Sequence, residues 1–128
     1  MRYVFFIVSA ILLYSCGSQK DVVRIEGESD SIDTVEYILI VDELGFESWM
    51  ATNSKRIWYY SNEYYTSWNK IYVIEFNHRV LTGADYPFVE TIYYDNSIDY
   101  GVELNYRLYW YFMFVQEKYN VSLLASGF

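Results

Sequence analysis

The sequence predicts an α+β protein, a small single domain in which two long helices pack with a small β-sheet, after a cleaved signal peptide and a short acidic tether. Two observations predict the domain. A run rich in β-branched residues at 35–41 is typical of a strand, and the stretches 61–81 and 99–119 repeat their apolar residues with the period of a helix. A third observation, an apolar segment directly after the first two residues, predicts the signal peptide.

The first 15 residues have the features of a secretory signal: one positive charge, an apolar run over 3–14, and the small Ser15. The run is shorter than the roughly 20 apolar residues that span a membrane. Residues 13–16 have the form of a lipobox, although Tyr14 is bulky for its position, and Cys16 is the only cysteine. We expect lipidation of Cys16, which anchors a protein to a membrane without spanning it. A chance cysteine after an ordinary signal and an uncleaved anchor are the alternatives.

Acidic residues are concentrated between this anchor and the domain. Residues 16–34 are rich in Ser, Asp and Glu, which predicts a flexible acidic tether. The formal net charge of −8 becomes −9 when cleavage removes Arg2, the only charged residue of 1–15. This charge excludes nucleic acid as a partner and also disfavours electrostatic docking on anionic lipid. The expected location is the cell envelope, on a membrane facing the periplasm, the outer membrane in particular.

The domain, 35–128, begins with the strand at 35–41, whose apolar run suits a buried or central strand. Asp42 is a suitable N-cap for a short helix from Glu43 to Thr52, although Gly45 is unfavourable in a helix interior. Residues 57–60 are predicted to be extended or irregular.

Ser61 is the predicted N-cap of a long helix that ends near Leu81. One face of this helix collects an apolar stripe made of Tyr64, Tyr65, Trp68, Ile71, Tyr72 and Phe76. A long connection follows at 82–96, and its segment 88–94 has the composition of a second strand.

The last helix is predicted over 100–119, with Asp99 as its N-cap and Asn120 as its C-terminal cap. It carries two apolar stripes, Val102/Tyr106/Tyr109/Met113 and Leu104/Leu108/Tyr111/Val115. Such a helix is buried on two sides, or it leaves one side for a partner. Residues 121–124 can add an edge strand.

Two Glu–Arg pairs share the same spacing and order on the two long helices. Glu75 and Arg79 lie within the apolar stripe, and Glu103 and Arg107 lie on the last helix. Charges on an apolar stripe need partners, so we expect a four-member network between the helices. The alternative interpretation is that Glu75 is a ligand-binding or catalytic carboxylate.

No catalytic, metal or cofactor motif is recognisable. His78 is the only histidine, and with no free cysteine it cannot supply the usual three or four ligands of zinc. The acids Asp95, Asp99 and Glu103 lack the spacing of a calcium loop and are better explained by a turn and a helix cap. Neither a phosphate-binding loop nor a hydrolase elbow is present, so we expect no cofactor.

The abundance of aromatic residues is the main functional clue, since 22% of the chain is Phe, Trp or Tyr. Rings in such number leave some aromatic surface, and Tyr and Trp are favoured in interfaces. We expect a non-enzymatic binding or structural module whose contact residues are Trp49, Tyr59, Tyr60, Tyr65 and Asn69, together with Asn62. Its partner is expected to be an envelope protein, peptidoglycan or another glycan. The alternative function is a small hydrolase of envelope glycans that uses Glu75 and Glu103 as paired carboxylates.

Three stretches have a distinctive sequence: Gly45-Phe46-Glu47-Ser48-Trp49, Trp58-Tyr59-Tyr60-Ser61 with Tyr64, Tyr65 and Asn69, and Ile98-Asp99-Tyr100-Gly101-Val102-Glu103-Leu104-Asn105-Tyr106. Through them the core from Tyr37 to Tyr119 resembles an uncharacterised family of short envelope lipoproteins of Gram-negative bacteria, a domain of unknown function. The resemblance implies a location in the envelope and a shared fold. It implies no catalytic role.

Overall fold

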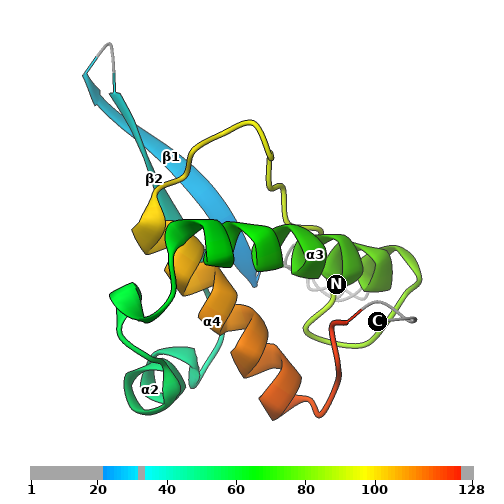
Figure 1. Cartoon of the computed structure of the whole chain (residues 1–128). Coiled ribbons are helices and arrows are strands. Elements are labelled where there is room, and N and C mark those ends of the chain that lie inside the picture. Colours follow the sequence, from blue (N-terminus) through cyan, green and yellow to red (C-terminus); the bar gives the residue numbers. More distant parts are fainter. Residues whose placement is uncertain (1–21, 32–33, 125–128) are drawn as a thin grey trace, which may run out of the picture.

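The computed structural model describes residues 22–31 and 34–124, so the predicted signal peptide and Cys16 lie outside the described residues. Its elements are β1 (Val23–Ser31), β2 (Thr34–Val41), α2 (Phe46–Asn53), the short 3₁₀ helix η2 (Ile57–Tyr59), α3 (Asn62–Leu81) and α4 (Val102–Lys118) (Figure 1). Helices packed with a small antiparallel sheet confirm the predicted α+β class. No described helix has the length and apolar character that a membrane span requires.

The two strands form an antiparallel hairpin in which Val23 pairs with Val41 and Ile25 with Leu39. Residues of alternate position face the helices, and Val23 and Leu39 are buried there. The other face is open, since Glu36 and Ile38 are exposed. The strand predicted at 35–41 is confirmed, but it belongs to a two-stranded ribbon whose tip projects away from the helices (Figure 1).

The tether predicted over 16–34 is wrong from Val22 onward, because residues 23–31 form β1. Val22 and Val23 are buried at the start of this strand. The acidic and polar residues that suggested a solvated segment occupy the rest of a ribbon that is covered on one face only. Local composition therefore fails to predict β1, because the stability of this strand comes from pairing with β2.

Helix α2 begins at Phe46, three residues later than predicted. Gly45 is its N-cap and has a φ of 92°, a left-handed conformation that glycine adopts without strain. Asp42 is not a cap, because its backbone N–H donates to the Val22 carbonyl at 2.7 Å and extends the hairpin. Phe46 is the one buried residue of α2 and packs edge-on against Tyr111 of α4, with ring centroids 5.6 Å apart.

Helix α3 begins and ends where it is predicted. The Ser61 side chain accepts a hydrogen bond from the Tyr64 backbone N–H at 3.1 Å, which is the expected N-cap. The buried face is rotated slightly from the predicted stripe. Asn69 and Val73 are buried along with Tyr65, Tyr72 and Phe76, whereas Tyr64, Trp68 and Ile71 are only partly buried.

Helix α4 is the centre of the domain and lies between α3 and α2 (Figure 1). It also contacts β2 and η2, so the interpretation of a helix buried on two sides is confirmed. It begins at Val102 and not at Tyr100, because Asp99 accepts a hydrogen bond from the Gly101 N–H and caps the preceding turn. Asn120 has a φ of 50°, in agreement with its predicted role at the C-terminal end.

The two further strands predicted at 88–94 and 121–124 are wrong, since both segments are irregular. In the segment 88–94, the side chain of Asn77 on α3 makes the backbone hydrogen bonds that a neighbouring strand would make. Its side chain donates to the Ile92 carbonyl at 2.9 Å and accepts from the Ile92 N–H at 2.7 Å. In the second segment the Leu123 N–H donates to the Gln116 side chain at 3.0 Å, and Leu123 itself is buried. Side chains thus satisfy backbone groups that a sheet would otherwise pair.

Candidate functional site

The predicted contact residues lie only partly at the surface. Tyr65 and Asn69 are fully buried, with 0% of each exposed, so the prediction is wrong for these two. Trp49 and Tyr60 are partly buried against the core. Tyr59, with 60% exposed, is the one member of the predicted set that solvent reaches freely.

Tyr65 and Asn69 connect elements of the core. The Tyr65 hydroxyl donates to the Ile57 carbonyl at 3.0 Å and ties η2 to α3. The Asn69 amide donates to the Asn105 carbonyl at 2.9 Å and joins α3 to α4. Their aromatic and amide groups made them plausible contact residues, but η2 and α4 cover them.

An exposed aromatic and basic cluster lies instead around η2, and we call Lys55, Arg56, Trp58 and Tyr59 the η2 surface. Trp58 is 72% exposed, more than Tyr59 beside it. The Arg56 guanidinium lies 5.4 Å from the centre of the Trp58 ring, and the Lys55 ammonium lies 5.8 Å from the Tyr59 ring. Each ring thus carries a cation against it.

The backbone under the η2 surface is held by tyrosines of α3 and α4, of which Tyr65 is fully buried and Tyr106 partly buried. Besides the bond from Tyr65, the Tyr106 hydroxyl of α4 donates to the Lys55 carbonyl. Tyr60 stacks on Tyr64 with ring centroids 3.9 Å apart and meets Tyr59 edge-on at 4.7 Å. The two exposed rings are therefore presented on a fixed support, which lowers the entropy lost when a partner binds.

Within the described ranges, the basic residues of the η2 surface, like Lys70 of α3, lack the carboxylate partners that the other bases have. Arg24, Arg79, Arg107 and Lys118 each form an ion pair with a carboxylate. Within residues 22–31 and 34–124, neither Lys55 nor Arg56 has such a partner, although the protein carries a net charge of −8. Lys55, Arg56 and Trp58 were missed as contact residues, and the signal was available: a Lys-Arg pair beside tryptophan in an acidic chain.

The predicted four-member charge network does not form as expected. Glu75 and Arg79 pair at 3.2 Å, but Arg107 pairs with Glu47 of α2 and not with Glu103. Arg107 also donates to the Leu39 carbonyl at 3.2 Å. Arg79 and Arg107 therefore belong to two separate ion pairs. The prediction failed because helix periodicity shows which residues share a face but not which element covers that face.

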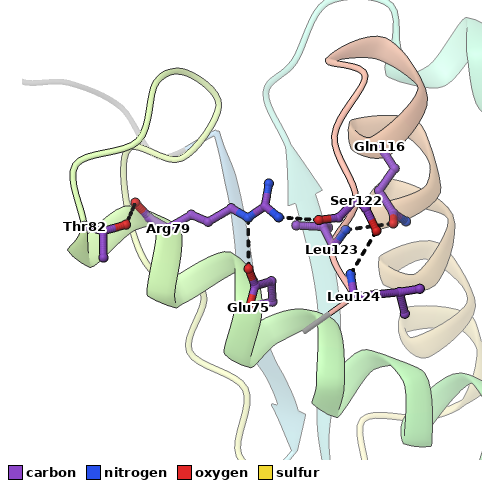
Figure 2. Close-up of polar contacts among 7 residues, drawn as sticks. All are labelled: Glu75, Arg79, Thr82, Gln116, Ser122, Leu123 and Leu124. Carbon is purple, nitrogen blue, oxygen red and sulfur yellow. Dashed lines mark hydrogen bonds and ion pairs between the residues drawn. The ribbon is translucent and has the colours of Figure 1, made fainter. Parts of the chain in front are cut away.

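Arg79 joins α3 to the C-terminal segment, as Figure 2 shows. Its guanidinium pairs with Glu75 and donates to the Ser122 carbonyl. It also lies 5.5 Å from the centre of the Phe88 ring. About a quarter of each side chain is exposed, 24% for Arg79 and 21% for Glu75, so solvent screens the pair in part.

We expect Arg79→Ala to lower the free energy of unfolding by about 1–2 kcal/mol, because it removes a charge-assisted bond and the packing on Phe88 as well as the ion pair. Glu75→Ala removes the ion pair alone and should cost under about 1 kcal/mol. The double variant should cost less than the sum. Urea denaturation of the three variants measures these changes, and a larger loss for Glu75→Ala would contradict the assignment.

A buried carboxylate that no sequence pattern indicated lies at the turn before α2. The Glu43 side chain is only 1% exposed. It accepts hydrogen bonds from the hydroxyls of Tyr111 and Tyr119 and pairs with the Lys118 ammonium at 3.4 Å. Burial first, and then the negative Glu43 nearby, raise the pKa of Tyr111. Glu43 is separated from Tyr111 by 68 residues and from Tyr119 by 76 residues along the chain, so local periodicity could not reveal the cluster.

Two shallow hollows on the surface of the described residues contain polar side chains. The larger, about 500 Å³, lies between the hairpin and the start of α4, where Glu103 lines it together with Glu28, Glu36 and Asp99. The smaller, about 370 Å³, has mainly amide and hydroxyl groups at its lining. Glu75 lines neither hollow.

The described residues contain no metal-binding arrangement of histidine, cysteine and carboxylate groups. His78 is exposed on α3. Asp95 accepts hydrogen bonds from the N–H and the hydroxyl of Ser97, at 2.8 and 2.7 Å. These bonds lower the pKa of Asp95, and they agree with the interpretation of a turn.

Fold and site together define a small α+β domain with a tyrosine-rich aromatic cluster and an exposed aromatic and basic surface. The chain belongs to a family of unknown function, DUF6146, whose family model matches residues 4–126. The expected membership of an uncharacterised family is thereby confirmed. Neither a curated protein nor a solved structure matches the chain.

Proposed function

We propose that this protein is an envelope lipoprotein, anchored through Cys16, whose domain binds an acidic protein partner through the η2 surface. Support for the anchor comes from the signal-like residues 1–15 and from the single cysteine at the end of the lipobox. Support for binding comes mainly from one observation: Trp58 and Tyr59 are exposed side by side, under two cations that have no carboxylate partner among the described residues.

The residue types of the η2 surface favour a protein as the partner. Trp, Tyr and Arg are the residues that most often dominate the binding energy of protein interfaces. An exposed Trp58 ring can fill a pocket on a partner, while Arg56 and Lys55 pair with its carboxylates. The smaller hollow, with its amides and hydroxyls, lies at the start of α3 and does not include these rings, so a glycan has less support at the η2 surface.

The hydrolase alternative has less support still. It needs two carboxyl groups that face each other across an open cleft. Glu103 lines the larger hollow, but Glu75 does not, and the Glu75 carboxylate is engaged by Arg79.

Photocrosslinking in cells tests the binding surface. Benzoylphenylalanine in place of Tyr59 keeps an aromatic ring there, and the same residue in place of Tyr93, which is 78% exposed, is the matched control. We expect a discrete crosslinked protein at position 59 and none at position 93. Adding Lys55→Glu and Arg56→Glu should abolish the product, because both cations are reversed.

Two outcomes contradict this assignment. The same product at both positions would show that the η2 surface is not the contact. A product degraded by glycan hydrolases but not by proteases would show a glycan partner. In the same cells, a fatty-acid label on the wild type that disappears in Cys16→Ser supports the anchor, and an unchanged label in the variant removes it.

A further inference from the structure

Leu44 is 93% exposed, the highest value among the exposed large apolar residues of the described chain. It lies at the turn between β2 and α2. An exposed leucine alone needs no explanation, but this one is held outward by the structure around it.

The turn is fixed from both sides. Glu43, the preceding residue, is buried and bonded to Tyr111, Tyr119 and Lys118. The Lys118 ammonium also donates to the Leu44 carbonyl at 3.2 Å. Gly45, the following residue, has a φ of 92° and is the N-cap of α2. Because both neighbours are held, Leu44 cannot turn inward without breaking the Glu43 cluster.

The residues around this turn are amphipathic. Tyr86 is half exposed, and its ring meets the Tyr119 ring edge-on at 5.9 Å. The Lys118 side chain is also partly exposed. Tyrosine and lysine with apolar stems and polar tips are the residues that prefer the boundary between lipid and water.

The charges next to the turn also suit a lipid surface. The exposed acid Asp42 pairs with Arg24 at 3.3 Å, and Glu43 pairs with Lys118. Both acids of the turn therefore have a basic partner, although Arg24 also pairs with Glu26 and the exposed Asp85 lies next to Tyr86.

The chain enters the described domain beside this turn. The Val22 carbonyl accepts a hydrogen bond from the Asp42 N–H at 2.7 Å. Five residues, 17–21, separate Val22 from Cys16, and a segment of this length reaches at most about 20 Å. The hairpin tip lies at the far end of the nine-residue β1, about 30 Å from Val23.

From this geometry we propose that the turn at 42–45, with Tyr86 and Tyr119, contacts the surface of the membrane that holds Cys16. This inference rests on the lipid anchor of the proposed function. One leucine is too small to hold a domain on a bilayer, so the anchor supplies the attachment and Leu44 fixes the orientation. The hairpin tip then points away from the membrane.

The test uses the full lipidated protein in phosphatidylcholine vesicles with brominated acyl chains. Lipid occupies the thiol of Cys16, the only cysteine, so Leu44→Cys creates the only free thiol for a bimane fluorophore. Val35→Cys, near the hairpin tip, is the matched control, because both side chains are exposed and neither replacement disturbs the core. We expect quenching at least about twofold stronger at position 44, where the label lies roughly 5–10 Å into the headgroup boundary.

Equal quenching at the two positions would overturn the membrane contact while leaving the anchor intact. A blue shift at position 44 without quenching by brominated lipid would also overturn it, and would indicate a protein occupant such as a second copy of this chain. Wild-type protein that reacts with the thiol reagent and does not float with vesicles would overturn both proposals, since Cys16 would then be free.

Discussion

Raising the pH above about 10 should unfold this domain cooperatively, with the tyrosinate absorbance and the loss of the helical circular dichroism following one curve. Burial is the first cause that raises the pKa of nine tyrosines in the folded protein. They are Tyr60, Tyr65, Tyr72, Tyr86, Tyr94, Tyr100, Tyr109, Tyr111 and Tyr119. An apolar surrounding disfavours the charged phenolate, so each of these groups loses its proton less readily in the folded domain than in the unfolded chain.

The free energy of unfolding falls with rising pH because the folded state holds the tyrosine protons more tightly than the unfolded state. In the unfolded chain these tyrosines ionise near pH 10, and in the folded domain they ionise at higher pH. Their contribution to stability is therefore complete below about pH 10 and is lost as the pH rises toward the folded pKa. Each tyrosine that is ionised only in the unfolded state lowers the free energy of unfolding by about 1.4 kcal/mol per pH unit.

The summed loss from these tyrosines is large compared with the usual free energy of unfolding of a domain, about 5–15 kcal/mol. Tyr65 and Tyr111 alone, both fully buried, should remove about 3 kcal/mol per pH unit. Tyr109→Phe deletes one titrating group from the core and should move the unfolding midpoint to higher pH. A tyrosinate signal that rises fully while the circular dichroism is unchanged would contradict this account of the core.

The elements that sequence predicts well are those with local signals. The strand at 35–41 has its β-branched run, and α3 has both its cap at Ser61 and its apolar period. β1 lacks such a signal, because Val23 and Ile25 are its only large apolar residues. Its stability depends on pairing with β2. The starting point of α2 was misplaced for a similar reason: Glu43 is withdrawn from the helix by Tyr111, Lys118 and Tyr119, which are distant in sequence.

The candidate site was predictable only in part, because tyrosine suits both core and surface. Tyr59 and Tyr65 are both tyrosines only six positions apart, yet one is exposed and the other is covered by η2 and α4. Only the packing of elements separates them. The basic neighbours of Trp58 were a stronger local signal than the ring count, since Lys55 and Arg56 stand together beside Trp58 and Tyr59 in a chain of net charge −8.

Replacing Glu43 by alanine should lower the free energy of unfolding by about 3 kcal/mol. The change removes the acceptor for the hydroxyls of Tyr111 and Tyr119 and the partner of Lys118. Tyr111 is fully buried, so its hydroxyl cannot turn to water and bears most of this cost. Lys118 is partly exposed and regains hydration, which keeps the total below that of a fully buried ion pair.

Glu47→Ala is the matched control, since Glu47 is also a glutamate paired with a base of α4 but its side chain is 68% exposed. We expect it to cost under about 1 kcal/mol. Adding Tyr111→Phe to Glu43→Ala should restore part of the lost stability, because no buried hydroxyl is then left without an acceptor. Urea unfolding of the four proteins measures the differences. A loss for Glu43→Ala no greater than that for Glu47→Ala would show that the buried cluster does not hold the turn that carries Leu44.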